Sequence, residues 1–253
     1  MNNQSERLRF ALTAVQAAGL IARDLFQSRL KVSYKEDDSP VTEADRQVEA
    51  SLRRAIADRF PGEKVLGEEE GETGHGDSQW VIDPIDGTKS YIAGVPLFAT
   101  LLSYEEDGVP MLGVCALPAL GDVLYAERSK GAFCNDRQCQ VSTTTEWSRA
   151  MIATAGPSSL TKTGLIERTN TLSTKVLASR TWCDAYGHAL VATGRVEAMI
   201  DPVLKVWDIS AVSLIVHEAG GKCTGLAGES WPRGGAISSN GLIHASLYAE
   251  LGL

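Results

Sequence analysis

Two stretches near the start of the chain have apolar residues every three or four positions, as on the buried face of a helix. The first predicts a helix over residues 5–29 with Ser5 as its N-cap. The second predicts a helix from a Thr42 cap to about Phe60, where Pro61-Gly62 ends it. Residues 35–40, which are charged and end in a proline, predict a turn between the two helices.

Beyond Phe60 short apolar runs alternate with turn residues, which is typical of strands. These runs lie at residues 65–66, 80–82, 95–103, 110–117, 124–127 and 131–135, and the segments 141–145 and 150–154 are expected to be a strand and a connector. From about residue 160 onward, the pattern of apolar residues predicts both helices and strands. Helices are predicted over residues 163–172, 184–193, 209–219 and 242–251, and strands over 175–178, 198–200 and 235–239. The change predicts a layered α/β fold with two subdomains, 1–150 and 151–253, that form one compact catalytic unit.

Composition excludes several classes of protein. The 253 residues are 43% hydrophobic and 22% charged, as in ordinary globular domains. The net charge of −8 argues against direct nucleic-acid binding and against anionic membranes. Five cysteines without a C-x-x-C pair argue against a disulfide framework and a zinc ribbon. With no long apolar run and a polar start, the sequence predicts a cytoplasmic protein without a membrane partner.

Carboxylates beside apolar residues are the most informative feature. They occur in four places: Glu68 to Glu70, the pair Asp83 and Asp86, Asp208, and Asp45. Buried carboxylates need partners, and few Lys or Arg lie next to these segments. A hard divalent cation would satisfy them, and all-oxygen ligation favours Mg²⁺ or Ca²⁺ over Zn²⁺.

The segment from Asp83 to Thr88 adds an anion site to the acids. Pro84 fixes the backbone between Asp83 and Asp86, and the Ile85 carbonyl is a further candidate ligand. Gly87 and Thr88 offer backbone N–H groups and a hydroxyl, which would bind a phosphate if a helical turn begins there. Metal ligands beside an anion site describe a metal-dependent phosphoryl-transfer centre.

Each motif alone has a simpler interpretation. The three glutamates are compatible with a solvated turn, Asp208 with a helix N-cap, and Asp83-Pro84 with an ordinary turn. A structural Ca²⁺ site is a further alternative, although it leaves Thr88 without a role. The joint occurrence of these motifs in one chain favours the catalytic interpretation.

The motifs also resemble those of a known family. The segments WVIDPIDGT (80–88) and WDISAVSLIVHEAGG (207–221) look like the two signatures of the inositol monophosphatase family of lithium-sensitive, magnesium-dependent phosphatases. The segments 67–69 and 41–45 resemble its upstream metal motif and its N-terminal motif. The resemblance implies an α-β-α-β-α layered fold of the inositol monophosphatase and fructose-1,6-bisphosphatase type, two to three Mg²⁺ ions per active site, and a homodimer.

The resemblance also implies roles for individual residues. The metal ligands would be Glu68, Asp83, the Ile85 carbonyl, Asp86 and Asp208. Asp45 and Thr88 match the pair that orients the attacking water, so that these two and Glu68 would be catalytic. The backbone of Gly87 and Thr88 matches the phosphate cradle, and Asp201 matches an acid that contacts the rest of the substrate.

Within the family, the substrate is indicated by other segments. The residues after Thr88 read Lys89-Ser90-Tyr91, where inositol phosphatases usually have Thr-Asn-Phe. Residues 94–98, 183–187 and 204–205 look more like the histidinol-phosphate phosphatase branch, with Asp184 and Lys89 as substrate contacts and Cys183 near the pocket. The alternatives are phosphatases of inositol 1-phosphate or of 3′-phosphoadenosine 5′-phosphate, and a non-enzymatic partner of the transcription machinery.

Overall fold

The computed structural model describes residues 4–28, 32–34, 40–182 and 184–253. Both predicted N-terminal helices are confirmed. Helix α1 is Glu6–Leu25, and the side chain of its N-cap, Ser5, accepts a hydrogen bond from the Leu8 N–H. Helix α2 is Glu43–Arg59 with Thr42 as its N-cap. Between them, the short strands β1 (Val32–Tyr34) and β2 (Pro40–Thr42) pair antiparallel.

The first large sheet has eight strands in the described part of the chain, in the order β10-β9-β8-β7-β6-β5-β3-β4. Its strands are β3 (Glu63–Gly67), β4 (Gly71–Thr73), β5 (His75–Asp86), β6 (Ala99–Glu106), β7 (Val109–Leu117), β8 (Asp122–Glu127), β9 (Ala132–Cys134) and β10 (Arg137–Gln138). Neighbouring strands are antiparallel except β3 and β5, which are parallel. The short helix α3 (Thr88–Ile92) follows β5 directly.

The second sheet comes from the rest of the chain, in the order β12-β11-β13-β15-β14. Its strands are β11 (Met151–Thr154), β12 (Ala178–Arg180), β13 (Ala198–Asp201), β14 (Lys222–Gly225) and β15 (Ala236–Ser239). The helices of this half are α4 (Pro157–Lys162), α5 (Ile166–Ser173), α6 (Asp184–Ala192), α7 (Val206–Glu218) and α8 (His244–Leu251), with a 3-10 turn at Trp147–Arg149.

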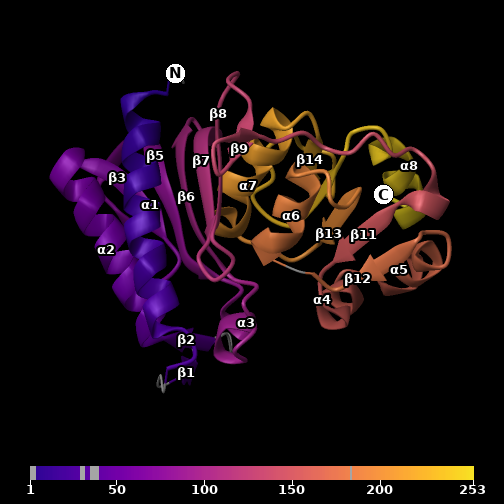
Figure 1. Ribbon diagram of the computed structural model, residues 1–253, viewed down its shortest axis with the longest axis horizontal. Coiled ribbons are helices and arrows are strands. Elements are labelled where there is room, and N and C mark those ends of the chain that lie inside the picture. Colours follow the sequence, from indigo (N-terminus) through magenta and orange to yellow (C-terminus); the bar gives the residue numbers. More distant parts are fainter. Residues whose placement is uncertain (1–3, 29–31, 35–39, 183) are drawn as a thin grey trace.

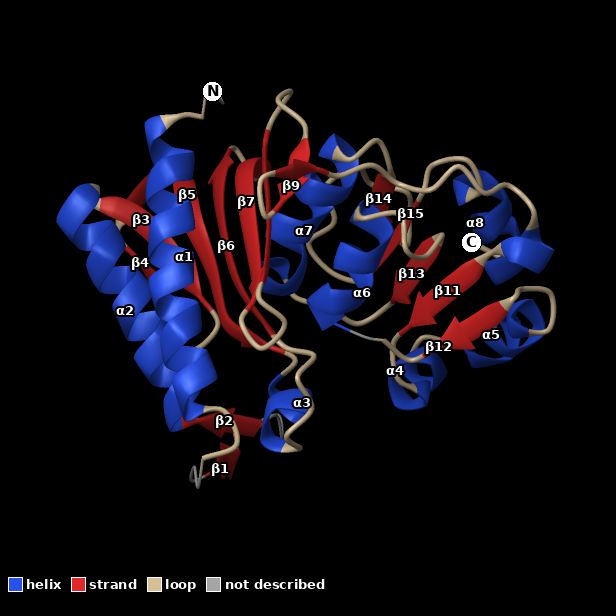
Figure 2. Ribbon diagram, viewed as in Figure 1, coloured by secondary structure: helices blue, strands red, loops and turns tan. Residues whose placement is uncertain are grey.

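The elements stack as helix, sheet, helix, sheet and helix layers, as the sequence predicts (Figures 1 and 2). Helices α1 and α2 pack on one face of the first sheet, and α6 and α7 lie between the two sheets. Helices α4, α5 and α8 cover the outer face of the second sheet, where Leu160, Leu172 and Leu247 join Ile152 and Ile200 in one apolar cluster. The layering brings the start of α7 against the strand that carries Asp83 and Asp86.

Several predicted elements differ from those in the structure. Residues 141–145 form no strand: this segment crosses from one sheet to the other, and the Val141 N–H donates to the Ala219 carbonyl. The helix predicted over 163–172 begins three residues later, as α5, because Gly164 has a left-handed conformation (φ +73°). Helix α4, which precedes Gly164, is not predicted from the sequence. The strand predicted at 175–178 lies three residues later, at β12. The turn predicted over 35–40 falls largely outside the described residues.

Candidate active site

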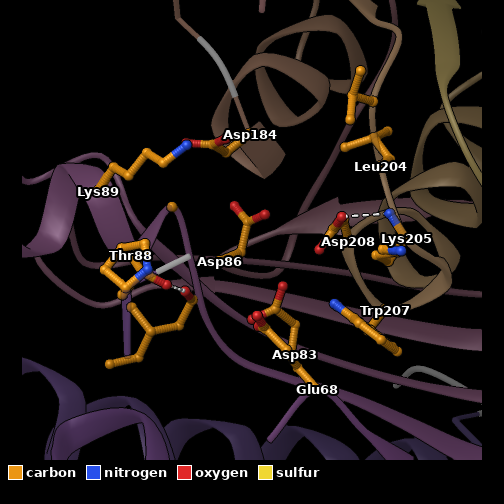
Figure 3. A pocket seen from close by; sticks show the side chains of 14 residues that line it. Glu68, Asp83, Asp86, Thr88, Lys89, Asp184, Leu204, Lys205, Trp207 and Asp208 are labelled. Atoms are coloured by element: carbon orange, nitrogen blue, oxygen red, sulfur yellow. Dashed lines mark hydrogen bonds between the residues drawn. The ribbon is translucent and has the colours of Figure 1, made fainter. Parts of the chain in front are cut away.

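A cavity of about 640 Å³ opens where α3, α6 and α7 meet the end of β5 (Figure 3). Its lining includes five acidic residues: Glu68, Asp83, Asp86, Asp184 and Asp208. Figure 3 shows the side chains of Asp83, Asp86 and Asp208 converging on its centre from the first sheet and from α7. Acids that the sequence places in separate motifs thus share one site.

Strand β5 positions Asp83 and Asp86. Its last residues are buried on both faces, and its pairing with β6 is interrupted between these two acids, where the Pro84 carbonyl accepts a hydrogen bond from the Thr100 hydroxyl (2.9 Å). The interruption gives the two side chains a common direction that regular strand alternation does not give to residues three apart. One oxygen of Asp86 accepts from the Ala185 N–H (2.7 Å), which ties the start of α6 to this strand.

Asp208 reaches the site from the first turn of α7. Its Oδ2 accepts a hydrogen bond from the Lys205 N–H (2.6 Å), so Asp208 is the third residue of the helix rather than its N-cap. One carboxylate oxygen from each of Asp83, Asp86 and Asp208 lies within 4.8 Å of the others. This geometry suits ligands that share a cation.

The electrostatics of the three acids favour the binding of a positive charge. Burial raises the pKa of Asp83 well above its ordinary value, and the charges of Glu68, Asp86 and Asp208 raise it further. Burial likewise raises the pKa of Asp86, and that of Asp208 to about 6. Asp83 Oδ1 is buried without a hydrogen-bond partner, and the ion pairs of the described residues include none of the three acids. The donor set therefore fits a hard cation.

Glu68 lies at the end of β3, beside β5 in the parallel register Gly67↔Ile82. Its N–H donates to the Ile82 carbonyl (3.2 Å), and its side chain lines the cavity next to Asp83. Its charge raises the pKa of both Asp83 and Asp208. The structure thus brings Glu68 to the acidic group, as the sequence predicts.

Asp45 and Thr88 meet beside the acidic group, although Asp45 itself does not line the cavity. The Thr88 hydroxyl donates to the Ile85 carbonyl (3.0 Å) and lies 3.5 Å from Asp45 Oδ1. Asp45 Oδ2 accepts from the N–H and the hydroxyl of Thr42 (2.7 and 2.6 Å) at the start of α2. Burial raises the pKa of Asp45, which the Thr42 hydrogen bonds partly offset.

The far side of the cavity carries Gly87, Lys89 and Asp184. Gly87 has a left-handed backbone (φ +80°), and a Cβ there would lie 3.0 Å from Asp184 Oδ2, so only glycine fits without strain. Figure 3 shows the Lys89 and Asp184 side chains extending toward one another. Both groups therefore border the space that a substrate would enter.

Comparisons with known proteins assign the family and the fold. The family model described as "Inositol monophosphatase family" matches residues 3–252. The chain belongs to the inositol monophosphatase family. It is 40% identical to a histidinol-phosphatase of Chlorobaculum parvum (97% of this chain, 96% of the relative) and 38% identical to one of Mycobacterium tuberculosis (96% and 97%). Among solved structures, the extragenic suppressor protein suhB of Bartonella henselae superposes with a TM-score of 0.92 at 29% identity, covering 98% of each chain.

Membership of the inositol monophosphatase family confirms the expected fold and class of reaction. These relatives indicate a phosphoric monoester hydrolase that acts on small phosphorylated substrates. The family is metal-dependent, and the carboxylate group of this chain is in keeping with that. No helix of the described residues is long and apolar enough to cross a membrane.

Asp201 and Cys183 are two further residues that the sequence places near the substrate. Asp201, at the end of β13, is buried and is not among the residues that line the cavity. Burial raises the pKa of Asp201 well above its ordinary value, and the charges of Asp184 and Asp208 raise it further. Cys183 lies outside the described residues.

Sequence analysis missed some residues of the site. Pro40, Val203 and Trp207 line the cavity. Lys205, which belongs to the segment 204–205 that the sequence associates with the substrate, lines the cavity and also caps α7 through its backbone. Glu49 is fully buried in α2 and contacts the turn after Glu68. Its spacing from Asp45, one helical turn, was the available signal.

Proposed function

We propose that the protein is a magnesium-dependent phosphatase that hydrolyses L-histidinol phosphate in preference to inositol 1-phosphate. The observation that carries the catalytic part is the convergence of the Asp83, Asp86 and Asp208 carboxylates, with an unpartnered buried oxygen on Asp83. The substrate preference is supported by the two histidinol-phosphatase relatives, whose similarity extends over nearly the whole chain.

The proposed ligands of two to three Mg²⁺ ions are Glu68, Asp83, the Ile85 carbonyl, Asp86 and Asp208. All five residues line the cavity, and all five offer oxygen. A bound Mg²⁺ supplies a Lewis acid that stabilises charge on the phosphoryl group and lowers the pKa of a water. The protein's own contribution is to hold these oxygens in place through β5 and through the capped first turn of α7.

Thr88 and Asp45 are the proposed pair that orients the attacking water. A water that donates to the Thr88 hydroxyl would pass a proton to Oγ1, which then donates its own proton to Asp45 Oδ1, 3.5 Å away. The raised pKa of the buried Asp45 suits it to accept that proton. The water oxygen bonds to phosphorus as the ester P–O bond breaks. The leaving alkoxide takes up a proton from solvent water to give the alcohol and inorganic phosphate, and Asp45 returns its proton to solvent.

Phosphate and substrate contacts complete the proposal. Gly87 and Thr88 begin α3, so their N–H groups lack intrahelical partners, and both residues line the cavity. Histidinol carries an ammonium and an imidazole, which favour carboxylates beyond the metal ligands. Asp184, which lies beside Gly87 and lines the cavity, is the first candidate to pair with the ammonium. Lys89 also lines the cavity, whereas Asp201 is buried and does not line it.

We also propose that residues 1–150 and 151–253 are subdomains of one catalytic unit, because each supplies residues to the same cavity. The resemblance to the family supports a homodimer in the cytoplasm. The proposed oligomer is tested by the mass of the purified protein in solution, for which a single-chain mass contradicts it.

The experiment for this function is a phosphate-release screen with Mg²⁺ and with a chelator. The panel contains histidinol phosphate, inositol 1-phosphate, 3′-phosphoadenosine 5′-phosphate and fructose 1,6-bisphosphate. We expect release only with Mg²⁺, and fastest from histidinol phosphate. Asp184→Asn and Asp201→Asn should each lose more activity on histidinol phosphate than on inositol 1-phosphate, because the ammonium pairs with a charge. No release from any of these substrates contradicts the proposal.

A further inference from the structure

Glu49 is a buried carboxylate that the proposed reaction does not use. It lies in α2 with its side chain fully buried, one helical turn after Asp45. A charged group in such a place destabilises the fold unless hydrogen bonds and an opposite charge offset its lost hydration. Its contacts therefore indicate what it does.

Within the described residues, every hydrogen bond of Glu49 with another part of the chain goes to the turn that follows Glu68. Its Oε2 accepts a hydrogen bond from the Glu69 N–H (2.8 Å), and its Oε1 accepts one from the Glu70 N–H (3.1 Å). Within α2, Arg53 Nε donates to the same Oε1 at 2.8 Å and supplies the opposite charge. Charge-assisted hydrogen bonds of this kind are stronger and more directional than neutral ones.

Arg53 extends the contact to the other end of the turn. Its Nη2 donates to the Gly71 carbonyl (2.5 Å), and its Nη1 donates to the Thr73 hydroxyl (2.9 Å). The pair formed by Glu49 and Arg53 therefore holds the backbone on both sides of the turn between β3 and β4. The turn cannot shift along α2 without breaking several of these bonds at once.

The approach of Glu49 to this turn requires a glycine. A Cβ on Gly67 would lie 2.1 Å from Glu49 Oε1, so any other residue would displace the carboxylate. Glu68 thus lies between two fixed points, because its own N–H donates to the Ile82 carbonyl of β5 and the next N–H donates to Glu49. Its backbone has little freedom to move relative to Asp83.

We propose that Glu49 is a positioning residue that holds Glu68 in place for the divalent cation. This inference rests on the proposed function, in which Glu68 is a metal ligand. Helix α2 would then contribute two residues to the site from one face. Asp45 contacts Thr88, and Glu49 contacts the turn after Glu68. Supporting residues of this kind typically change metal affinity by about 10- to 100-fold when they are removed.

The central variant is Glu49→Gln. The amide keeps the size of the side chain but replaces one accepting oxygen by an NH₂ group. At least one of the three donors to Glu49, which are Arg53 Nε and the N–H groups of Glu69 and Glu70, then faces another donor and loses its hydrogen bond. Glu43→Gln is the matched control, because Glu43 is on the same helix, loses the same charge and is exposed. Glu68→Gln and the double variant Glu49→Gln/Glu68→Gln complete a double-mutant cycle.

Two readouts do not depend on turnover: the dissociation constant of Mg²⁺ by titration calorimetry, and the rise in melting temperature on adding Mg²⁺ to chelator-treated protein. We expect Glu49→Gln to weaken Mg²⁺ binding by about 10-fold or more and to reduce that rise, with the Glu43→Gln values unchanged. At saturating Mg²⁺, kcat should recover to within a few-fold. The double variant should bind Mg²⁺ no more weakly than Glu68→Gln, because Glu49 acts through Glu68.

Unchanged Mg²⁺ affinity in Glu49→Gln, or an effect in the double variant equal to the product of the single effects, contradicts the positioning role. An unchanged affinity in Glu68→Gln instead contradicts the proposed metal site itself, so the two failures are distinguishable. If Glu49→Gln does not fold, Glu49→Asp replaces it. That variant keeps the negative charge beside Arg53, but its side chain is one methylene shorter and its carboxylate lies farther from the Glu69 and Glu70 N–H groups. The results expected for Glu49→Gln, and those that would contradict the proposal, are the same for Glu49→Asp.

Discussion

Asp83 and Asp208 lie far apart in the sequence, yet their carboxylate oxygens come within 4.8 Å of each other. Asp83 comes from the interior of β5 and Asp208 from the first turn of α7, so the contact joins the first sheet to the C-terminal half of the chain. Burial raises the pKa of both groups, and the charge of Glu68 raises both further. The fold keeps like charges close together, which is costly unless a cation binds between them.

Replacing either buried β5 acid by its amide should abolish turnover without unfolding the protein. In Asp83→Asn or Asp86→Asn, kcat/KM should fall by more than the ~100-fold that loss of a supporting residue can cost. Melting temperature in chelator should stay the same or rise, because one like charge is removed from the group. Phosphate release and thermal melting check this, with Asp58→Asn on the exposed face of α2 as the control. Unchanged turnover in either variant, or full activity of the wild-type protein in excess chelator, contradicts the assignment.

Thr88→Ala should lower kcat far more than it raises KM. Loss of a hydroxyl that orients the attacking water affects the transition state rather than substrate binding, and a positioned proton-transfer group contributes on the order of 10²-fold or more. Thr88→Ser, which keeps the hydroxyl 3.5 Å from Asp45, is the matched control and should retain most activity. Steady-state kinetics of both variants test this prediction. A change in KM alone would show that Thr88 contacts the phosphate and does not orient the attacking water.

Lithium should inhibit the enzyme in the millimolar range. The family resemblance implies this sensitivity, and Li⁺ is a small hard cation that suits oxygen ligands such as those of Glu68, Asp83, Asp86 and Asp208. Initial rates are measured in LiCl and in KCl at the same ionic strength. Equal effects of the two salts would show screening alone and no specific competition at the site.

The protein should be less stable in mild acid, because the buried His188 cannot easily be protonated in the folded state. Burial lowers the pKa of His188 to about 3, so the folded state stays neutral at this position where the unfolded chain, with an ordinary pKa of 6.5, takes up a proton. Stability therefore falls as pH drops below 6.5, by about 2 kcal/mol at pH 5, and this loss levels off only near pH 3.

The variant His188→Asn isolates this contribution. Asparagine does not titrate and keeps a polar group near Ser238, to which His188 Nδ1 is hydrogen-bonded at 2.7 Å. Free energies of unfolding measured between pH 7 and pH 5 should fall more steeply for the wild type than for the variant. Parallel curves would show that His188 has the same pKa in the folded and unfolded states.

Local signals in the sequence were sufficient for the two N-terminal helices and for the acids of the site. The caps Ser5 and Thr42 predicted the starts of α1 and α2, and acids beside apolar runs predicted that Asp83, Asp86 and Asp208 share a site. These features depend on neighbours in the sequence. The resemblance to the inositol monophosphatase family then gave the layered fold.

Features that depend on distant partners were missed. Residues 141–145 have the composition of a strand, but their course is set by the two sheets that they connect. Glu49 looks like an ordinary helix acid, because its partners are backbone N–H groups in a turn about 20 residues later. The place of Asp201 behind the cavity rather than at its lining depends on how α6 packs against β13.

The most direct test of the account is the ratio of kcat/KM for L-histidinol phosphate to that for inositol 1-phosphate, measured with saturating Mg²⁺ on the wild-type protein. The account predicts a ratio well above one, because carboxylates beyond the metal ligands, Asp184 first, favour a substrate with an ammonium and an imidazole. A preference for inositol 1-phosphate of about tenfold or more, equivalent to about 1.4 kcal/mol in transition-state binding, would contradict it.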